Sequence, residues 1–315
     1  MSDNKALAII VSVIGFLIAL ALNLFVPDKQ DVIQKAYRFI LIALSVLYLA
    51  LGIRALISRD YAKKYIFKSK FIFAMGIVLA VWDLFSSKLD ILEMPFFPSP
   101  GKVCMVFIDE YEFLLQNVYY SLRLFTVGFL SGIILGIGTG ILIGWFARVK
   151  YWVFPVLKIT GIIPAVAWMP FALTIFPTSF VAGAFLIAIC AWFPVAFMTA
   201  QGMATTQQVY FDVAKTLGGS TWYQLFRVAL PNAFPNIFTG ISTASGLAFT
   251  TLIVSEMMGA QGGLGYYINW SKAWSAYYKI YAAIVIMAIL FSLILKVVSL
   301  IQGRVLRWQK GLLYE

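Results

Sequence analysis

Histidine is absent from this sequence of 315 residues, and cysteine occurs only at Cys104 and Cys190. The lack of imidazole excludes histidine-based catalysis and histidine-ligated metal sites, and the distant cysteines form no Cys-x-x-Cys metal or redox pair. We interpret both cysteines as small apolar residues. A Gly-x-x-x-x-Gly-Lys-Ser/Thr phosphate-binding loop is absent too, so we expect the chain to hydrolyse no nucleotide and to bind no cofactor of its own.

Charge is scarce: charged residues make up 12% of the sequence, whereas hydrophobic residues make up 62%. A soluble protein carries about a quarter charged residues, because its surface faces water. No charged side chain occurs between Ile159 and Phe211, a stretch long enough for two membrane crossings of about 20 residues each. We therefore predict an all-α protein that crosses a membrane several times.

The net charge of +11 does not indicate a nucleic-acid partner. The basic residues form no face or stripe but lie between the apolar runs, where membrane topology accounts for them.

Eight apolar segments are candidate membrane spans. They cover residues 6–26, 39–53, 71–85, 124–147, 152–176, 180–198, 236–257 and 280–300. The first contains Ala19-Leu20-Ala21, which resembles a signal-peptide cleavage site, but the apolar run continues to Val26, so we expect an uncleaved span.

Five glycines at intervals of four residues mark one face of the fourth span, namely Gly128, Gly132, Gly136, Gly140 and Gly144. Such a small-residue face predicts close packing against another helix of a bundle.

Basic residues between the second and third spans set the predicted orientation. This loop carries a single acid, Asp60, and six bases: Arg54, Arg59, Lys63, Lys64, Lys68 and Lys70. Cytoplasmic loops are enriched in Lys and Arg, so we place this loop in the cytoplasm. Alternating crossings then place both termini in the cytoplasm as well.

The segment from Thr205 to Pro231, between the sixth and seventh spans, predicts two short amphipathic helices. In the first, Val209, Val213 and Leu217 share one side, Thr205 or Thr206 is the cap, and Gly218 ends the helix in the left-handed conformation. The second is capped by Ser220 or Thr221 and ended by Pro231; its apolar residues are Trp222, Leu225, Phe226 and Ala229. Such helices either lie at the membrane surface or dock into a protein groove.

This segment resembles the "EAA" loop of permeases from binding-protein-dependent ABC importers. Asp212-Val213-Ala214, then Gly218, then Leu230-Pro231 correspond to its Glu-Ala-Ala, Gly and Leu-Pro elements, with Asp and Val replacing the first Glu and Ala. The resemblance extends over residues 75–305. The further segments that carry it are Phe97-Pro98-Ser99-Pro100, Ser121-Leu122-Arg123, Ile163-Pro164, Met169-Pro170 and Ser255 to Gly265. These resemble the branch of sulfonate, taurine, nitrate, bicarbonate and thiamine-precursor permeases, although Phe176-Pro177-Thr178-Ser179 departs from the Phe-Gly turn usual there.

The resemblance implies a type I ABC importer transmembrane domain in a prokaryotic inner membrane. It places a six-span family core at 68–315 and leaves two extra helices with the basic loop at 1–67, whose role stays open. Its implied partners are membrane lipid, a second permease copy, an external substrate-binding protein, and cytoplasmic ATPase subunits that bind ATP and Mg²⁺. The residues that it assigns to coupling with the ATPase are Asp212, Val213, Ala214, Leu217, Gly218, Leu230 and Pro231.

Glu256 follows a long uncharged run and is the main candidate for the translocation path or a gate, together with Met169 and Pro170. A buried carboxylate is costly and usually lies in a bundle interior or a cavity. A position where the membrane meets water on its outer side, without a function, is an equally open interpretation of Glu256.

Two other classes of protein compete with an importer subunit. An ion-coupled secondary transporter usually has ionisable residues within the membrane and repeated, broken helices, and here intramembrane acids are scarce. An integral membrane enzyme would need a reactive cluster, which a sequence without histidine and with few clustered carboxylates does not offer.

Overall fold

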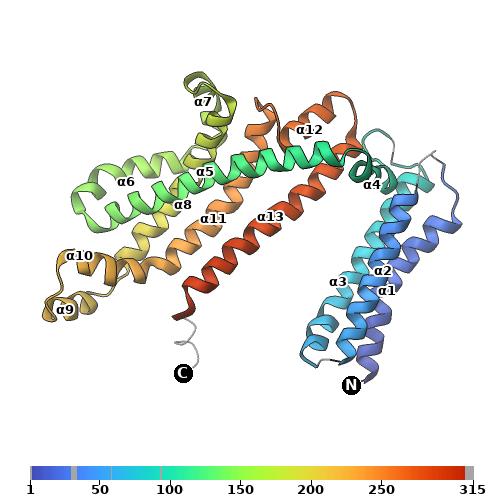
Figure 1. Ribbon diagram of the computed structural model, residues 1–315, viewed down its shortest axis with the longest axis horizontal. Coiled ribbons are helices and arrows are strands. Elements are labelled where there is room, and N and C mark those ends of the chain that lie inside the picture. The colour runs from blue at the N-terminus through green and yellow to red at the C-terminus, as the bar shows by residue number, and fades with distance from the viewer. Residues whose placement is uncertain (1, 30–33, 58, 93, 309–315) are drawn as a thin grey trace. The chain divides into compact units, whose positions relative to one another are not determined.

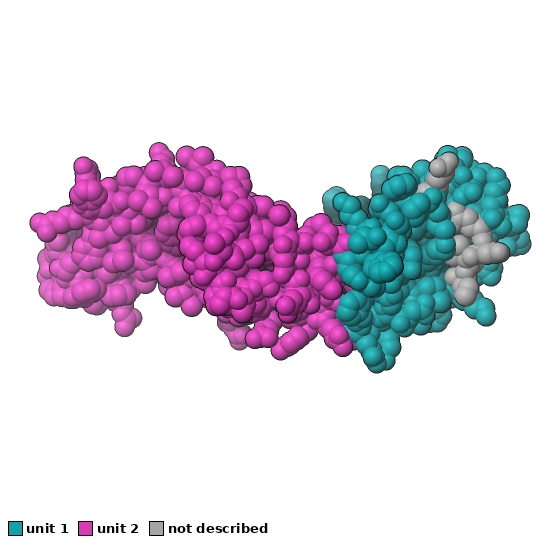
Figure 2. Space-filling model, turned by 90° about the horizontal axis from the view of Figure 1, so that it is seen from above, with its two compact units in different colours: residues 1–114, 270–284 teal, residues 115–269, 285–315 magenta. Residues whose placement is uncertain are grey.

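The structure is a computed structural model that describes residues 2–29, 34–57, 59–92 and 94–308. Within these ranges the chain is helical and contains no strand (Figure 1). It forms two compact units, residues 1–114 with 270–284 and residues 115–269 with 285–315 (Figure 2). Seven helices of the described ranges are long and apolar enough to cross a membrane, or eight spans if one bent pair is counted. The predicted all-α fold with about eight spans is therefore confirmed.

The first unit contains a bundle of α1 (Ser2–Phe25), α2 (Lys35–Ile57) and α3 (Arg59–Asp83). Phe16, Tyr37 and Leu41 are fully buried in its core. Gly15 of α1 and Gly76 of α3 let these two helices approach so closely that a Cβ on either would meet the other backbone. Because α3 packs on α1 and α2, the first unit extends past residue 67, where the predicted N-terminal part ends.

The basic residues predicted to form a loop between the second and third spans lie on helices instead. The helix α2 ends at Ile57 and α3 begins at Arg59, so Lys63, Lys64 and Lys68 occupy the first turns of α3. The expectation of a loop was wrong here, because α2 extends to Ile57 and helical structure resumes at Arg59. Lys is a good helix former, and its charged end reaches water from a helix end.

A buried polar network lies at the other end of this bundle, around the π-helical turn η1 (Leu84–Lys88). Asn23 donates a hydrogen bond of 2.8 Å from Nδ2 to Oδ2 of Asp83, and Lys88 pairs with Asp28 at 2.8 Å. Lys88 also donates to the carbonyl of Val26 at 2.6 Å. Paired and hydrogen-bonded in this way, the charges can be buried at the end of a bundle.

The first unit also contains α4 (Pro100–Asp109), part of α12 (Leu264–Ala273) and the start of α13 (Tyr277–Val305). One side of α4 is buried, because Val103 and Val106 pack against the unit. Cys104 lies half-buried on α4, outside the candidate spans, and burial raises the pKa of its thiol to about 11. It therefore stays protonated at neutral pH, which agrees with its interpretation as a small apolar residue.

The second unit contains α6 (Ala147–Ile162), α7 (Met169–Ile175), α8 (Ser179–Ala204) and α11 (Leu230–Met257), with most of α5 (Tyr111–Trp145) and of α13. The glycine face of α5 packs against α8: a Cβ at Gly132 would meet the backbone of Ala188, and one at Gly140 would meet Thr199. The predicted close approach at this face is confirmed. The helix α8 in turn packs along α11.

The predicted fifth span, residues 152–176, is broken. The helix α6 ends at Ile162, and the 3-10 turn η2 (Ala165–Trp168) with α7 continues at an angle of 98° to it. Pro164 lies at the break and has no backbone N–H to continue the ladder. Irregular backbone of this kind is tolerated at membrane depth only where protein or a water-filled cavity surrounds it.

Candidate coupling site and translocation path

The segment 205–231, which we name the coupling segment, begins with the short helix α9 (Gln208–Thr216). It lies beyond the end of α8 in Figure 1. The predicted threonine cap was wrong: Gln207 is the cap residue and makes no side-chain bond. Thr206 is engaged elsewhere, since its hydroxyl accepts a hydrogen bond of 3.1 Å from Nδ2 of Asn232.

Gly218 ends α9 as predicted. Its φ of +79° is left-handed, and Gly219 donates a hydrogen bond of 2.8 Å from its backbone N–H to the carbonyl of Ala214. Glycine adopts this conformation without the steric cost that a Cβ carries. Ser220 is the predicted cap of the next helix, because its hydroxyl accepts from the backbone N–H of Tyr223 at 3.2 Å.

The second helix does not end at Pro231. The turn α10 (Thr221–Tyr223), the π-helix η3 (Gln224–Ala229) and α11 form one helical run up to Met257. Proline breaks a helix where its ring meets the carbonyl of the preceding turn. The wider π-helical turn before Leu230-Pro231 provides room for the ring, so the helix continues into the seventh span.

One side of the coupling segment holds it to the rest of the second unit. The ring of Phe211 packs edge-on against Trp145 of α5, with ring centroids 5.9 Å apart. Ala214, Leu225 and Ala229 are buried. The position of α9 is therefore fixed by side-chain packing and not only by the chain segments that connect it to α8 and α10.

The other side of the coupling segment is apolar and exposed. Val209, Val213 and Leu217 have exposed fractions of 63%, 53% and 82%. Asp212 is exposed beside them and accepts a hydrogen bond from Gln208 at 3.3 Å. A hollow of about 700 Å³ adjoins this side and is lined by Tyr210, Val213, Ala214, Leu217, Tyr223, Arg227, Val228, Pro231, Asn232 and Trp308. A contiguous exposed apolar surface of this kind is typical of a docking site.

Glu256, the predicted path or gate residue, lies at the end of α11 with an exposed fraction of 1%. Its Oε2 accepts a hydrogen bond of 2.8 Å from the backbone N–H of Gly265. Glu256 is therefore buried within the protein, and its role in a path or gate stays a prediction. The carboxylate holds the start of α12, which follows the loop 258–263, against the end of α11.

Two further side chains hold the junction between this loop and α12, and sequence reasoning did not identify their role. Asn117 accepts from the backbone N–H of Gly263 at 2.9 Å, and the hydroxyl of Ser121 accepts from that of Leu264 at 2.8 Å. Both are buried and lie one turn apart on α5. We name Asn117, Ser121, Glu256 and the junction that they hold the loop clasp. The spacing of four residues between two polar side chains in an apolar helix was the available signal.

Met169 and Pro170, the other predicted path residues, begin α7 after the break in the fifth span. Met169 is buried against Ala172, Ala182 and Leu186, whereas Pro170 is exposed. The structure does not bring them together with Glu256, and their role in a path stays a prediction.

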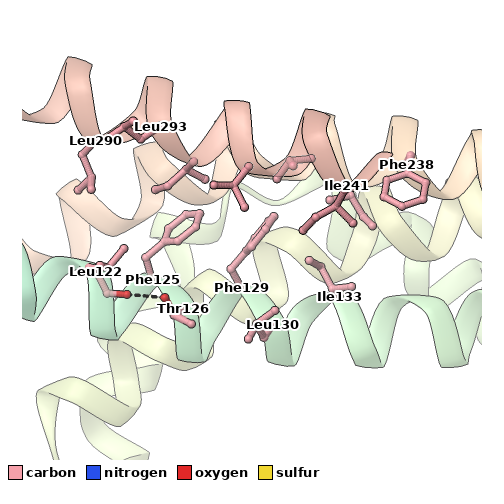
Figure 3. A pocket seen from close by; sticks show the side chains of 14 residues that line it. Leu122, Phe125, Thr126, Phe129, Leu130, Ile133, Phe238, Ile241, Leu290 and Leu293 are labelled. Carbon is pink, nitrogen blue, oxygen red and sulfur yellow. Dashed lines mark hydrogen bonds between the residues drawn. The ribbon is translucent and has the colours of Figure 1, made fainter. Parts of the chain in front are cut away.

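The groove in Figure 3 lies between α5, α11 and α13 and has a volume of about 560 Å³. Thr126 contributes the one polar side chain among its 14 lining residues, and its hydroxyl donates to the carbonyl of Leu122. Phe125 and Phe129 stack beside it with ring centroids 4.9 Å apart. Such a groove suits an apolar occupant, and its lining contains no charged side chain for a small anion.

Comparison with known proteins agrees with this architecture. The family model "Binding-protein-dependent transport system inner membrane component" matches residues 132–310. The chain is 30% identical to SsuC of Bacillus subtilis (strain 168), a permease named for aliphatic sulfonates, over 75% of this chain and 86% of the relative. It is 33% identical to the bicarbonate transport system permease CmpB of Synechococcus elongatus, over 62% of this chain and 68% of the relative.

Among solved structures, the MetNI methionine ABC transporter in an inward-facing conformation contains a chain of similar fold. The TM-score is 0.53 at 21% identity, and the match covers 62% of this chain and 98% of that one. This likeness concerns the fold alone. With the match over residues 132–310 and the sequence identities above, the chain belongs to the inner membrane components of binding-protein-dependent transport systems, the permease subunits of ABC importers.

Proposed function

We propose that this permease imports a small anion or small polar organic molecule of the sulfonate, nitrate, bicarbonate or thiamine-precursor class. Two copies of the chain form the path, cytoplasmic ATPase subunits bind the coupling segment, and an external binding protein delivers the substrate. The names of the sulfonate and bicarbonate relatives support the substrate class.

The exposed apolar side of α9 is the observation that carries this proposal. Val213 and Leu217 are half or more exposed although they lie on an amphipathic helix whose other side is buried. An amphipathic helix that packs its apolar residues into a partner's groove is a common mode of recognition. The left-handed turn at Gly218 and the buried Ala214 then make the helix a rigid part that transmits movement of the ATPase to α11.

ATP supplies the energy for transport on this proposal. The chain carries no Walker-type phosphate loop, so the nucleotide and its Mg²⁺ bind to the partner ATPase. Proteoliposomes that contain the permease, its ATPase and its binding protein are expected to take up one of taurine, nitrate, bicarbonate or formylaminopyrimidine only when ATP is present on the ATPase side. Uptake driven by an ion gradient without the ATPase would instead identify a secondary transporter.

The coupling segment and both termini face the cytoplasm on this proposal. The bases at the start of α3 support this orientation, because positive residues are retained on the cytoplasmic side. A Lys63→Cys variant, in a chain with both native cysteines replaced by Ala, is expected to react with a membrane-impermeant maleimide in inside-out vesicles. Lys63 is exposed, so the label reaches it without unfolding. Labelling in intact cells, and not in inside-out vesicles, would show that the chain has the opposite orientation in the membrane.

A further inference from the structure

We propose that the groove between α2 and the start of α3 binds an anionic phospholipid, with the phosphate held by Lys64 and Lys68 and the acyl chains against the neighbouring aromatic side chains. The groove has a volume of about 620 Å³ and lies wholly within the first unit. Its lining residues are Tyr48, Leu51, Tyr61, Lys64, Tyr65, Phe67, Lys68, Phe71 and Ile72.

The position of the groove along α3 places it at the boundary between lipid and water. The candidate span Tyr61–Lys88 has 28 residues, whereas the hydrocarbon of a bilayer needs about 20. The opposite end of this span is closed by the buried pair of Lys88 and Asp28. The first turns of α3, which carry Tyr61 and Lys64 of the groove, therefore reach the head-group region, and Phe71 and Ile72 lie deeper.

The polar side of the groove carries positive charge. Lys64 and Lys68 are exposed and one turn apart. Among the side chains that the structure describes, no acid forms an ion pair with either lysine. The guanidinium of Arg54, at the end of α2, lies 5.3 Å from the ring centre of Tyr61 and adds a third positive group beside the groove. Basic pockets between helices at this depth are a recurring form of anionic head-group site.

The apolar side of the groove is aromatic and faces outward. Phe67 and Phe71 have exposed fractions of 87% and 74%, so neither is buried by the chain itself. Aromatic side chains favour the membrane interface, where acyl chains contact the ring and head groups contact its polar edge. The hydroxyl of Tyr65 is engaged within the bundle, since it donates to the carbonyl of Tyr48 at 2.8 Å. The floor of the groove is thus preformed.

Charge and shape together favour a lipid over a soluble anion or a protein partner. Two lysines above an open aromatic wall match a ligand that is anionic at one end and apolar at the other. Each basic residue near an anionic lipid surface increases the binding affinity about fivefold. This proposal concerns α2 and α3 and stands apart from the transport function, so either can fail without the other.

Native mass spectrometry of the purified full-length permease tests the proposal, with dioleoyl phosphatidylglycerol and dioleoyl phosphatidylcholine as probes. Wild type is expected to retain one phosphatidylglycerol at concentrations where phosphatidylcholine is lost. The double variant Lys64→Ala with Lys68→Ala is expected to bind phosphatidylglycerol at least about tenfold more weakly. Gel filtration and helical circular dichroism check that it stays folded.

The chain offers a matched control for charge. Lys63 and Lys70 are exposed on the opposite side of α3 and do not line the groove. The variant Lys63→Ala with Lys70→Ala removes the same two charges and is expected to bind phosphatidylglycerol within about twofold of wild type. Equal losses in both double variants would overturn the site, because they would indicate general attraction by net charge. Displacement of the lipid by glycerophosphoglycerol at similar concentration would also overturn it, because the acyl chains would then contribute nothing.

Discussion

Leu217→Asp is expected to reduce ATP-driven uptake at least about 30-fold while the permease stays folded and inserted. Leu217 is 82% exposed, so a polar replacement changes the stability of the isolated chain by less than about 0.5 kcal/mol. In the proposed complex with the ATPase the same position would be buried, and a carboxylate there would be desolvated without a partner. Disruption of such an interface residue costs about 2–4 kcal/mol of binding free energy, and 2 kcal/mol corresponds to about 30-fold.

Two measurements separate coupling from folding in this variant. Uptake in proteoliposomes reports transport, and the amount of ATPase that co-purifies with the permease reports docking. Gln207→Asp is the matched control, because it adds the same charge at the N-cap of α9, where the helix dipole favours it and the native side chain makes no cap hydrogen bond. We expect this control to retain uptake within about twofold. Wild-type uptake and normal co-purification with Leu217→Asp would show that α9 is not the docking helix.

Local signals in the sequence predicted the coupling segment well at Gly218 and Ser220. Both sites depend on short-range chemistry: a glycine for a left-handed residue and a hydroxyl for a helix N-terminus. The helix period likewise identified the exposed stripe of Val209, Val213 and Leu217, although the sequence could not show which side of α9 the chain buries. That choice depends on Phe211 and Trp145, which are far apart in sequence and 5.9 Å apart in space.

The sequence could not predict how the chain passes from the coupling segment into α11. Pro231 usually ends a helix, yet the π-helix η3 absorbs it. A π-helical turn has no characteristic amino-acid composition, since it inserts one residue into an otherwise ordinary helix.

The break in the fifth span was missed for a similar reason. The composition of residues 152–176 predicts one apolar span, whereas the structure bends by 98° at Pro164.

The loop clasp depends on contacts that no local pattern contains. Asn117 and Gly263 are 146 residues apart and share a hydrogen bond of 2.9 Å. Polar side chains in an apolar helix signal that some partner exists, because an unpaired polar group in this environment is costly. They do not identify the partner. Only Glu256, an isolated acid after 28 uncharged residues, indicated from sequence that this end of α11 is special.

Gly263→Ala is expected to destabilise the permease by about 2–4 kcal/mol and to reduce uptake in proportion to the loss of folded protein. Gly263 has a φ of +113°, a conformation that side chains disfavour by about 1–3 kcal/mol. An added Cβ would also overlap the buried carboxylate of Glu256, and the loop clasp leaves that group little room to move. Thermal unfolding of the purified permease, followed by tryptophan fluorescence, measures the change.

Gly259→Ala is the matched control within the same loop. A Cβ at Gly259 would meet only Leu173, at an ordinary contact distance of 3.5 Å, so we expect a change below about 0.5 kcal/mol. The double variant Gly263→Ala with Glu256→Ala separates overlap from backbone strain. The second substitution removes the carboxylate that the new Cβ would meet. The double variant should therefore lose less free energy of unfolding than the two single variants together, by about 0.5–3 kcal/mol. Strict additivity would show that Glu256 does not confine Gly263, and the loop clasp would then be held by Asn117 and Ser121 alone.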